Sequence, residues 1–264
     1  MTNFNSKVLG AIAILVVFAH SSVPAQAQVK MNLSVFHQGI SENGQLWYSY
    51  FDGKKWAPDV QVPNVGMSFS PSAVAMPGGG ISVFHQGPKV QAEPVGLNTL
   101  SGVLTELMVA RQNQGVFPGI FLPDGQLWYS YFDGKKWAPD VQVPNVGMSG
   151  SPSAVALPGG GISVFHQGVS FQAFQNTKIN TPNGQLWCSY FDGKKWAPDV
   201  QVPNVGMSVS PSAVAMPGGG ISVFHQGISQ NGQLWYSYFD GKKWAPDVQV
   251  PNVGMSESPS AVVF

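Results

Sequence analysis

The stretch NGQLWYSYFDGKKWAPDVQVPNVGMS, residues Asn43 to Ser68, decides the fold because the chain repeats it. Near-identical copies begin at Asn183 and Asn231, and another copy, led by Asp124, begins DGQLWYSYFDGKKW. The glutamine of GQLW falls at positions 45, 126, 185 and 233, which are 81, 59 and 48 residues apart. The histidine of VFHQG falls at positions 37, 85, 166 and 225, which are 48, 81 and 59 residues apart. Both series indicate a repeated unit of about 48 residues.

The two longer spacings locate insertions at about residues 88–122 and 169–181, each after a VFHQG segment. The first insertion contains LNTLSGVLTELMVARQ, which could form either a short amphipathic helix or a loosely packed cap. All eight tryptophans and all seven tyrosines lie inside the repeated units. The repeats are therefore expected to form the core.

Each unit holds four strand-like runs separated by turn signals. SPSAVAM (Ser70–Met76) is followed by a Pro-Gly-Gly-Gly turn and by ISVFHQ (Ile81–Gln86). QLWYSYF (Gln45–Phe51) is closed by Asp-Gly, a strong hairpin signal, and KWAPDVQV (Lys55–Val62) completes the set. Pro58 interrupts the last run, which suits an outer edge strand. No unit shows sustained helical periodicity.

Four short antiparallel strands in a unit of this length are typical of a β-propeller blade. The small residues of SPSAVA suit the crowded strand nearest the axis, and the aromatic middle strands suit faces that pack against neighbouring blades. We therefore predict an all-β fold, a β-propeller of four four-stranded antiparallel blades.

The two ends of the repeat array are expected to complete each other. The first unit opens with LSVFHQG, a second strand, and the sequence stops at SPSAVVF, a first strand. Pairing of these N- and C-terminal strands would complete one blade and remove an open edge. Two alternatives stay open, because a second copy of the chain could complete the ring, or the chain could be a shortened relative of a longer array.

The first residues predict a secretory signal peptide, residues 1–27. Lys7 precedes an apolar run, Val8 to Phe18, and Ala25-Gln26-Ala27 fits the A-x-A cleavage pattern. The apolar run is shorter than the roughly 20 residues that span a bilayer, so we expect no membrane insertion. The predicted product is a single propeller domain, residues 28–264, that is secreted or periplasmic.

The charge and the cysteine count exclude several classes of function. Thirteen basic and thirteen acidic residues balance, so the surface has no electrostatic footprint for nucleic acid. The single cysteine, Cys188, cannot form an internal disulfide. It stands where the other copies have tyrosine, which favours sequence drift at a tolerant position over a redox role.

The strand order gathers two kinds of loop on one face of the propeller. The loops between second and third strands lie there with the links between blades, while the PGGG and DGKK turns lie on the opposite face. Both insertions fall on the first face, and long loops on a rigid scaffold more often serve recognition than folding. Aromatic rings beside amide and imidazole groups at this face would suit a neutral sugar, which stacks on a ring and pairs its hydroxyls. The predicted sugar-binding residues are His37, Gln45, Trp47, Asn64, His85, Gln86, Gln126, Trp128, Asn145, His166, Gln167, Gln185, Trp187, Asn204, His225, Gln226, Gln233 and Trp235.

These residues also have simpler interpretations. Core packing accounts for part of the tryptophan surface, and the four histidines most simply make structural hydrogen bonds, with sugar contact ranked second and metal binding last. They lie off the axis and lack neighbouring ligands at zinc spacing, so we predict no metal site and no cofactor. The Lys-Lys pairs are interpreted as solvated turn charges.

The repeated segment, with SVFHQG (Ser82–Gly87), resembles the repeats of bacterial and fungal β-propeller lectins. The PLL-type fucose-binding lectins are the nearest group, and tachylectin-type propellers are more distant. The resemblance covers most of residues 33–264 apart from the two insertions. It implies shallow saccharide pockets between adjacent blades, although the low blade number and the long insertion after His85 depart from the family.

The predicted function is that of a secreted, multivalent, non-enzymatic lectin for glycans or glycoconjugates, with fucosylated glycans as one candidate. Several identical pockets on one rigid face would raise avidity by roughly 10² to 10⁴. A protein-interaction or adhesion scaffold is the alternative, and a homo-oligomer is an open possibility. A sialidase-like enzyme ranks lower, because the turn from Ser49 to Trp56 only approximates an Asp-box and the chain has one arginine, Arg111, where such enzymes use three.

Overall fold

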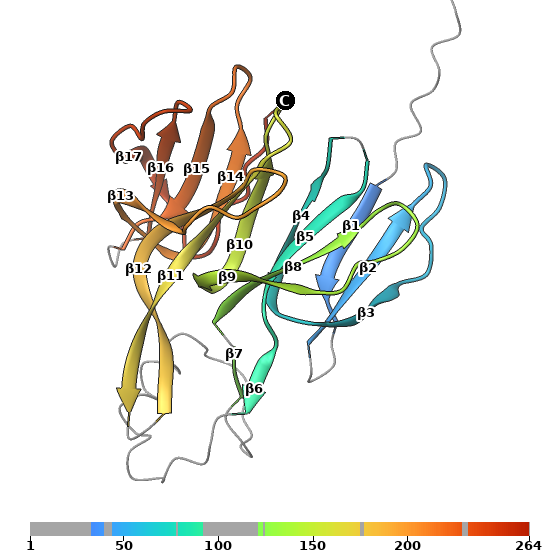
Figure 1. Cartoon of the computed structure of the whole chain (residues 1–264). Coiled ribbons are helices and arrows are strands. Elements are labelled where there is room, and N and C mark those ends of the chain that lie inside the picture. The colour runs from blue at the N-terminus through green and yellow to red at the C-terminus, as the bar shows by residue number, and fades with distance from the viewer. Residues whose placement is uncertain are drawn as a thin grey trace, which may run out of the picture.

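The computed structural model describes residues 33–39, 44–77, 79–91, 121–123, 125–174, 177–228 and 232–263. Every regular element in these ranges is a β-strand (Figure 1). The predicted signal peptide and the candidate helix of the first insertion lie outside the described residues. No helix able to cross a membrane occurs in the described ranges.

All the strands except the pair β6–β7 form four antiparallel sheets, one for each repeat. Sheet 1 contains β1 (Leu33–Gln38), β2 (Gln45–Phe51) and β3 (Val60–Gly66). Sheet 2 contains β4 (Ser68–Ala75), β5 (Ile81–Gln86), β8 (Gln126–Phe132) and β9 (Val141–Gly147). Sheet 3 contains β10 (Ser149–Ala156), β11 (Ile162–Phe174), β12 (Thr177–Phe191) and β13 (Val200–Gly206). Sheet 4 contains β14 (Ser208–Ala215), β15 (Ile221–Gln226), β16 (Gln233–Phe239) and β17 (Val248–Gly254).

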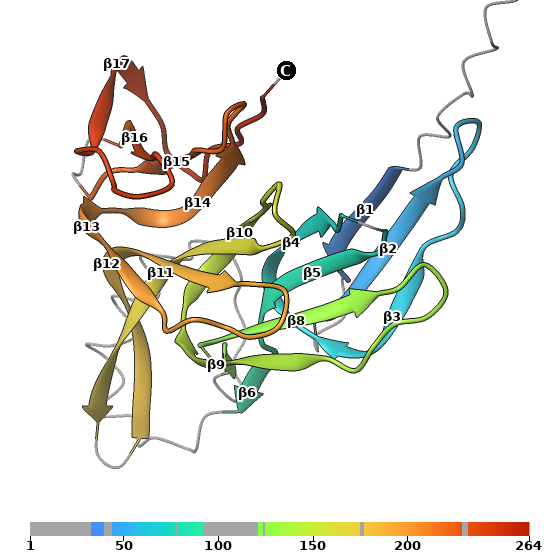
Figure 2. The same ribbon diagram turned by 45° about the horizontal axis from the view of Figure 1, so that its top comes forward.

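The four sheets follow one another in chain order around an arc (Figure 2). The inner strands β4, β10 and β14 contact each other in succession, and β1 contacts β4. This arrangement confirms the predicted all-β fold with one antiparallel sheet for each repeat.

The predicted pairing of the N- and C-terminal strands is not formed in this structure. Sheet 1 has three strands, and residues 256–263 belong to no strand. These last residues are instead held against β14, where Ser258 Oγ accepts a hydrogen bond from Ser210 N and Ala261 N donates one to Ser212 Oγ. The segment therefore follows sheet 4 in the arc, whereas β1 lies at the other end.

The middle strands have the predicted bounds, but the outer strand begins later than predicted. Asp52 Oδ1 accepts hydrogen bonds from the backbone N–H groups of Lys54 and Lys55 at 2.8 and 2.9 Å, which forms a tight turn. Trp56 returns as an isolated bridge to Phe51, and β3 starts only at Val60, beyond Pro58. The predicted strand Lys55–Val62 is therefore wrong in its bounds.

The two insertions extend one end of the sheets (Figure 1). In sheet 3 the insertion forms an antiparallel ribbon that continues β11 and β12 up to the pair Phe174–Thr177. In sheet 2 the described part of the insertion is a two-stranded ribbon, β6 (Lys89–Gln91) paired with β7 (Phe121–Pro123).

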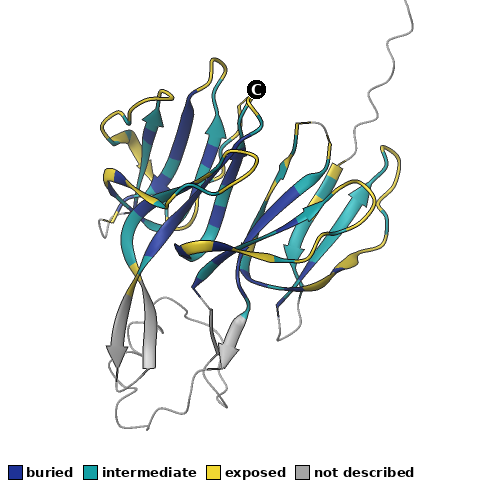
Figure 3. Cartoon of the chain, viewed as in Figure 1, coloured by how far each residue is buried: buried dark blue, intermediate teal, exposed yellow. Residues whose placement is uncertain are grey.

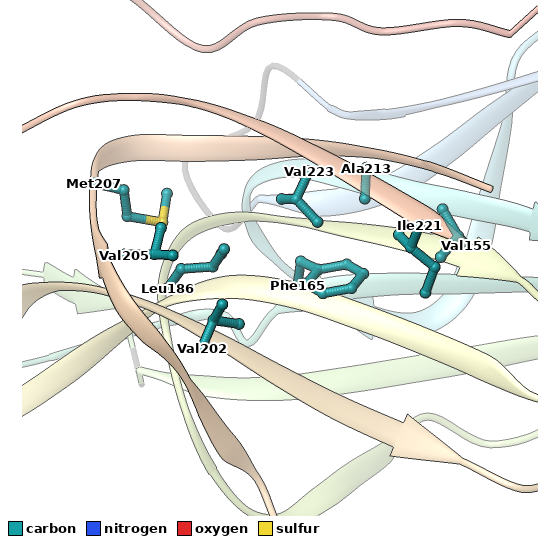
Figure 4. Close-up of a cluster of buried hydrophobic side chains, with 9 residues drawn as sticks. All are labelled: Val155, Phe165, Leu186, Val202, Val205, Met207, Ala213, Ile221 and Val223. Carbon is teal, nitrogen blue, oxygen red and sulfur yellow. The ribbon is translucent and has the colours of Figure 1, made fainter. Parts of the chain in front are cut away.

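The buried hydrophobic side chains form clusters that each join two neighbouring sheets. The buried residues lie along the strands, whereas the exposed ones are most frequent in the turns (Figure 3). Between sheets 3 and 4, Phe165 and Leu186 pack against Val205, Met207 and residues of the next sheet (Figure 4). Equivalent clusters join sheets 2 and 3 and sheets 1 and 2. Each sheet is thus stabilised mainly by its neighbours, as in other repeat arrays.

Candidate functional site

Two equivalent pockets lie between adjacent sheets. The first, about 770 Å³, lies between sheets 2 and 3, and the second, about 890 Å³, lies between sheets 3 and 4. In each, one wall is the Pro-Asn segment of the outer strand of the preceding sheet. The other wall is the Lys-Trp-Ala-Pro-Asp segment of the following sheet, with the tryptophan of its third strand.

The same side chains recur in both pockets. Asn145, Trp187, Lys195, Trp196 and Asp199 line the first pocket. Their counterparts in the second are Asn204, Trp235, Lys243, Trp244 and Asp247. The repeat therefore builds the same mixed surface of ring, amide, ammonium and carboxylate at two junctions.

A tight turn places Lys195 and Trp196 in the first pocket. Asp192 Oδ1 accepts hydrogen bonds from the backbone N–H groups of Lys194 and Lys195, both at 2.8 Å. The hydrogen bond from Lys195 and then that from Lys194 lower the pKa of the Asp192 carboxyl below its usual value. Trp196 then packs 5.2 Å from the Phe191 ring, measured between centroids, at the seam between the sheets.

Asp199 links the pocket to a buried polar network. His166 Nε2 and Ser189 Oγ both contact Asp199 Oδ1, at 3.2 and 2.7 Å, and His166 Nδ1 lies 3.3 Å from the carbonyl oxygen of Gln167. An N–H at either ring nitrogen therefore has an oxygen acceptor within reach. Among the described residues, Oδ2 of Asp199 takes part in no such contact.

All four repeats contain this histidine–aspartate pair, but its exposure differs. The His85, His166 and His225 side chains are fully buried, whereas the His37 side chain is 43% exposed. The carbonyl of Gln38 and then the Asp59 carboxylate raise the pKa of His37 against the opposing effect of burial. These contacts give the histidines the structural role that the sequence analysis ranked first, and none of the four lines either pocket.

No group of three or more potential metal-ligating side chains occurs in the described part of the chain.

The glutamines of the sequence prediction also lie outside the two pockets. Gln86, Gln167 and Gln226 donate from Nε2 to the carbonyl oxygens of Met148, Met207 and Met255 at 2.8 to 3.0 Å, which ties each second strand to the link that follows its sheet. In the third strands, Gln45, Gln126, Gln185 and Gln233 accept hydrogen bonds from glutamines of the outer strands.

The predicted asparagines have a special backbone conformation. Asn64, Asn145 and Asn204 have φ angles of 58° to 59°, in the left-handed region that asparagine tolerates better than most residues. Asn145 and Asn204 line the two pockets, and Asn64 is exposed at the equivalent place in sheet 1.

A glycine holds each pocket tryptophan in place. A Cβ on Gly168 would lie 2.4 Å from Trp187 Nε1, and one on Gly227 would lie 2.7 Å from Trp235 Nε1. The rings therefore pack directly on glycine backbone. Trp187 and Trp235 are the predicted tryptophans that line the pockets, whereas Trp47 and Trp128 hold the same strand position in sheets 1 and 2.

Several pocket residues were not predicted from the sequence, above all Lys195, Trp196 and Asp199 with their counterparts in sheet 4. The DGKK turns were expected on the face opposite the sugar site, with their lysines as solvated turn charges. The missed signal is the repeated segment Trp-Ala-Pro-Asp, which sets a ring and a carboxylate three residues apart in the sequence.

Three solved structures are similar to this chain. A protein of unknown function from Dyadobacter fermentans is 14% identical, with a TM-score of 0.54 over 86% of this chain and 67% of that one. Aleuria aurantia lectin, in complex with Fucα1-6GlcNAc, is 15% identical, with a TM-score of 0.50 over 83% of this chain and 57% of that one. A mutant of NanB sialidase from Streptococcus pneumoniae is 11% identical, with a TM-score of 0.50 over 85% of this chain and 50% of that one.

The antiparallel sheets of this chain, one for each repeat, and these similarities identify its fold as a β-propeller array. The chain spans half to two thirds of the length of the three solved chains. No protein-family model matches the sequence, and no curated protein sequence matches it.

Proposed function

We propose that this chain is a multivalent carbohydrate-binding protein whose binding sites are the pockets between adjacent sheets. The observation that carries the proposal is the recurrence of one mixed surface in two pockets. A pyranose has an apolar face that stacks on an aromatic ring and hydroxyls that need donors and acceptors. Trp187 offers the ring, Asn145 and Lys195 offer donors, and Asp199 offers an acceptor.

The pockets suit weak, repeated binding better than tight binding of one ligand. They are open clefts at sheet junctions, and each holds only a few polar groups. Two or more such sites on one rigid array would engage a glycan-coated surface together, which raises avidity by roughly 10² to 10⁴. Repetition of the segment then has a functional consequence beyond folding.

The choice of glycan for the first test comes from the comparison of folds. Aleuria aurantia lectin was solved with Fucα1-6GlcNAc bound, so we propose a fucosylated glycan as the first ligand to test. We also propose that binding occurs without catalysis, because the chain has a single arginine and sialidases clamp their substrate carboxylate with three. The predicted signal sequence supports export of the protein to a place where glycans are exposed.

The test is a glycan array followed by calorimetry with the best ligand. We expect the double variant Trp187→Ala/Trp235→Ala to bind at least about tenfold more weakly, which corresponds to about 1.4 kcal/mol per site. Tyr190→Ala is the matched control, since Tyr190 is 40% exposed on the same strand as Trp187 but lines neither pocket. Absence of glycan binding by the wild-type protein would refute the proposal, and so would binding that the double variant retains in full. If the chain binds a cell-surface protein and free sugar does not compete with that binding, the adhesion alternative is favoured.

A further inference from the structure

One packing arrangement recurs at every junction between sheets. The tryptophan that follows the DGKK turn packs against a phenylalanine of the preceding sheet and, at the first two junctions, against a tyrosine, whose place Cys188 takes at the third. Trp137 lies 6.0 Å from the Phe36 ring at 85° and 5.8 Å from Tyr48. Trp196 lies 6.0 Å from Phe84 at 86° and 5.8 Å from the tyrosine beside it. The third junction is similar, with Trp244 lying 5.9 Å from Phe165 at 89°.

Each end of the array exposes one of the two surfaces that meet at a junction: the tryptophan lies at the first end, and the phenylalanine and tyrosine lie at the last. Trp56, at the first end, is 50% exposed, whereas the Nε1 atoms of Trp137 and Trp196 are buried. At the last end, Phe224 and Tyr236 lie 5.9 Å apart, the same separation as at the Phe84 junction, with no tryptophan against them among the described residues.

The inner strands repeat a second feature of the junction, a ladder of serine hydrogen bonds. The backbone N–H of Ser70 donates to Ser151 Oγ at 3.0 Å, that of Ser151 donates to Ser210 Oγ at 2.8 Å, and that of Ser210 donates to Ser258 Oγ at 3.1 Å. The segment Ser256–Val263 therefore occupies the place of a fourth inner strand, after β4, β10 and β14. Its far side is open, and Val262 is 79% exposed.

Within the described ranges, sheet 1 has no inner strand like this segment. Leu33 and Val35 of β1 are 51% and 45% exposed, whereas the matching residues of β11, Ile162 and Val164, are 2% and 0% exposed. The exposed edge of β1 thus has free pairing capacity and two uncovered apolar side chains. An edge of this kind is a ready template for another strand.

We infer that a second copy of this chain docks head to tail on the first. Residues 256–263 of one copy pair with β1 of the other as the fourth strand of sheet 1. Trp56 of that second copy then packs against Phe224 and Tyr236 of the first, and Leu33 and Val35 become covered.

The structure favours a second copy over the chain's own opposite end. The junction distances repeat to within about 0.1 Å, so the packing itself sets how far each sheet turns from the last. With this packing, four sheets leave β1 and the segment 256–263 unpaired, at opposite ends of the arc (Figure 2). Two chains can form between them junctions with this same packing, while every junction within each chain stays intact. Together they hold eight sheets, which lies within the usual range for propellers.

The new junction would also complete a further pocket. Asn252 of one copy has a φ of 59°, as Asn145 has 58° in the first pocket. Trp47 and Asp59 of the other copy hold the positions of Trp187 and Asp199 in the repeat. The cleft between them exists only in the assembly. Glycan binding in this cleft rests on the proposed function, whereas the docking of the second copy does not rest on it.

The test uses the chain without its predicted signal peptide and measures its mass in solution by light scattering and sedimentation. We expect twice the chain mass for the wild-type protein, and one chain mass for Trp56→Arg and for Phe224→Arg. An equimolar mixture of these two variants should recover association, because one junction of the pair then has both intact faces. A symmetric contact between like faces would not show this recovery. Tyr190→Arg is the matched control, since it changes an exposed aromatic residue away from both end faces and should leave the dimer intact.

The inference is overturned if the wild-type chain stays monomeric up to about 100 μM, or if Trp56→Arg remains dimeric. Should either variant fail to fold, hydrogen exchange of the wild-type protein decides the matter. The amides of β1 should become protected as concentration rises, and protection that does not depend on concentration refutes docking of a second copy. Glycan binding by the pocket with Trp187 is measured separately in the monomeric variants, so failure of the proposed function is distinguishable from failure of the docking.

Discussion

Replacing His166 with alanine tests whether the buried histidine–aspartate pairs hold the candidate site together. His166 is fully buried, and its Nε2 lies 3.2 Å from Oδ1 of Asp199, whose side chain is 11% exposed. The variant leaves Asp199 with Ser189 as its hydrogen-bond partner at Oδ1 and opens a cavity the size of an imidazole. Asp199, which lines the first pocket, should then be held less firmly because its contact with His166 is lost.

The expected loss follows from burial. Removing His166 takes a buried hydrogen bond away from the Asp199 carboxylate, which costs about 1.5 to 3 kcal/mol, and the cavity left by the imidazole adds to that loss. The chain offers its own control in His37, which makes the same contact with Asp59 at 3.1 Å but with side chains 43% and 40% exposed. Exposed pairs contribute about 0 to 1 kcal/mol, so His37→Ala should cost little.

The assay is urea denaturation followed by tryptophan fluorescence, with thermal unfolding as a second measurement. Both variants are made in the Trp56→Arg background, so that no second copy covers His37. We expect His166→Ala to lower the free energy of unfolding by about 3 kcal/mol more than His37→Ala, which is roughly 6 to 12 °C in Tm. The double variant His166→Ala/Asp199→Asn should recover part of the loss, because it removes the uncompensated charge.

Equal losses at His166 and His37 would refute the reasoning, since the two sites share their sequence and differ in burial. A loss below about 1 kcal/mol at His166 would show that the pair contributes no more than a surface ion pair.

Three further outcomes are expected. Burial, and then the charge of Asp199, raise the pKa of the Cys188 thiol to about 12, so its alkylation by iodoacetamide at pH 8 should be much slower than that of a free thiol until urea unfolds the chain. The pKa of His37 is raised, so an NMR titration should place it above 6.5. Its contribution to stability should be complete below pH 6.5 and be lost as the pH rises through the folded-state pKa, and Asp59→Asn should lower that pKa. Gly168→Ala should force the indole of its neighbouring tryptophan to move, costing about 1 to 3 kcal/mol by denaturation and weakening glycan binding. Gly159→Ala should leave binding intact, since a Cβ there meets nothing within 4 Å and the residue is not in the left-handed region.

The sequence predicted the strands whose signals are local. Alternating apolar residues and the flanking turns defined ISVFHQ and QLWYSYF, and both have the predicted bounds in the structure. The outer strand was misplaced because a side chain decides where it starts. Asp52 captures two backbone N–H groups and bends the chain, so the extended backbone after Trp56 has no partner strand until Val60.

The candidate site was predicted less well because it forms between repeats. Asn145 and Trp187 belong to different units, and only the packing of sheet 2 against sheet 3 brings them to one pocket. Lys195 was assigned to the opposite face because the strand order alone does not show how far the segment after the turn runs back along the sheet. Buried glutamines such as Gln167 resemble sugar ligands in composition, but the structure uses the amide to bind the carbonyl of Met207.

The end copies show most clearly what a repeat sequence leaves open. Trp56 and Trp196 occupy the same segment, Lys-Lys-Trp-Ala-Pro, yet one is half exposed and the other wedges between aromatic rings of a neighbouring sheet. Because the local sequence is the same, the difference can come only from whether another sheet is present. Each repeat therefore contributes one of the two surfaces that form a junction. In a repeat at the end of the array, that surface is exposed to solvent. The surface available for association is set by the position of a unit in the array, while the surface available for a ligand is set by the pair of units that meet.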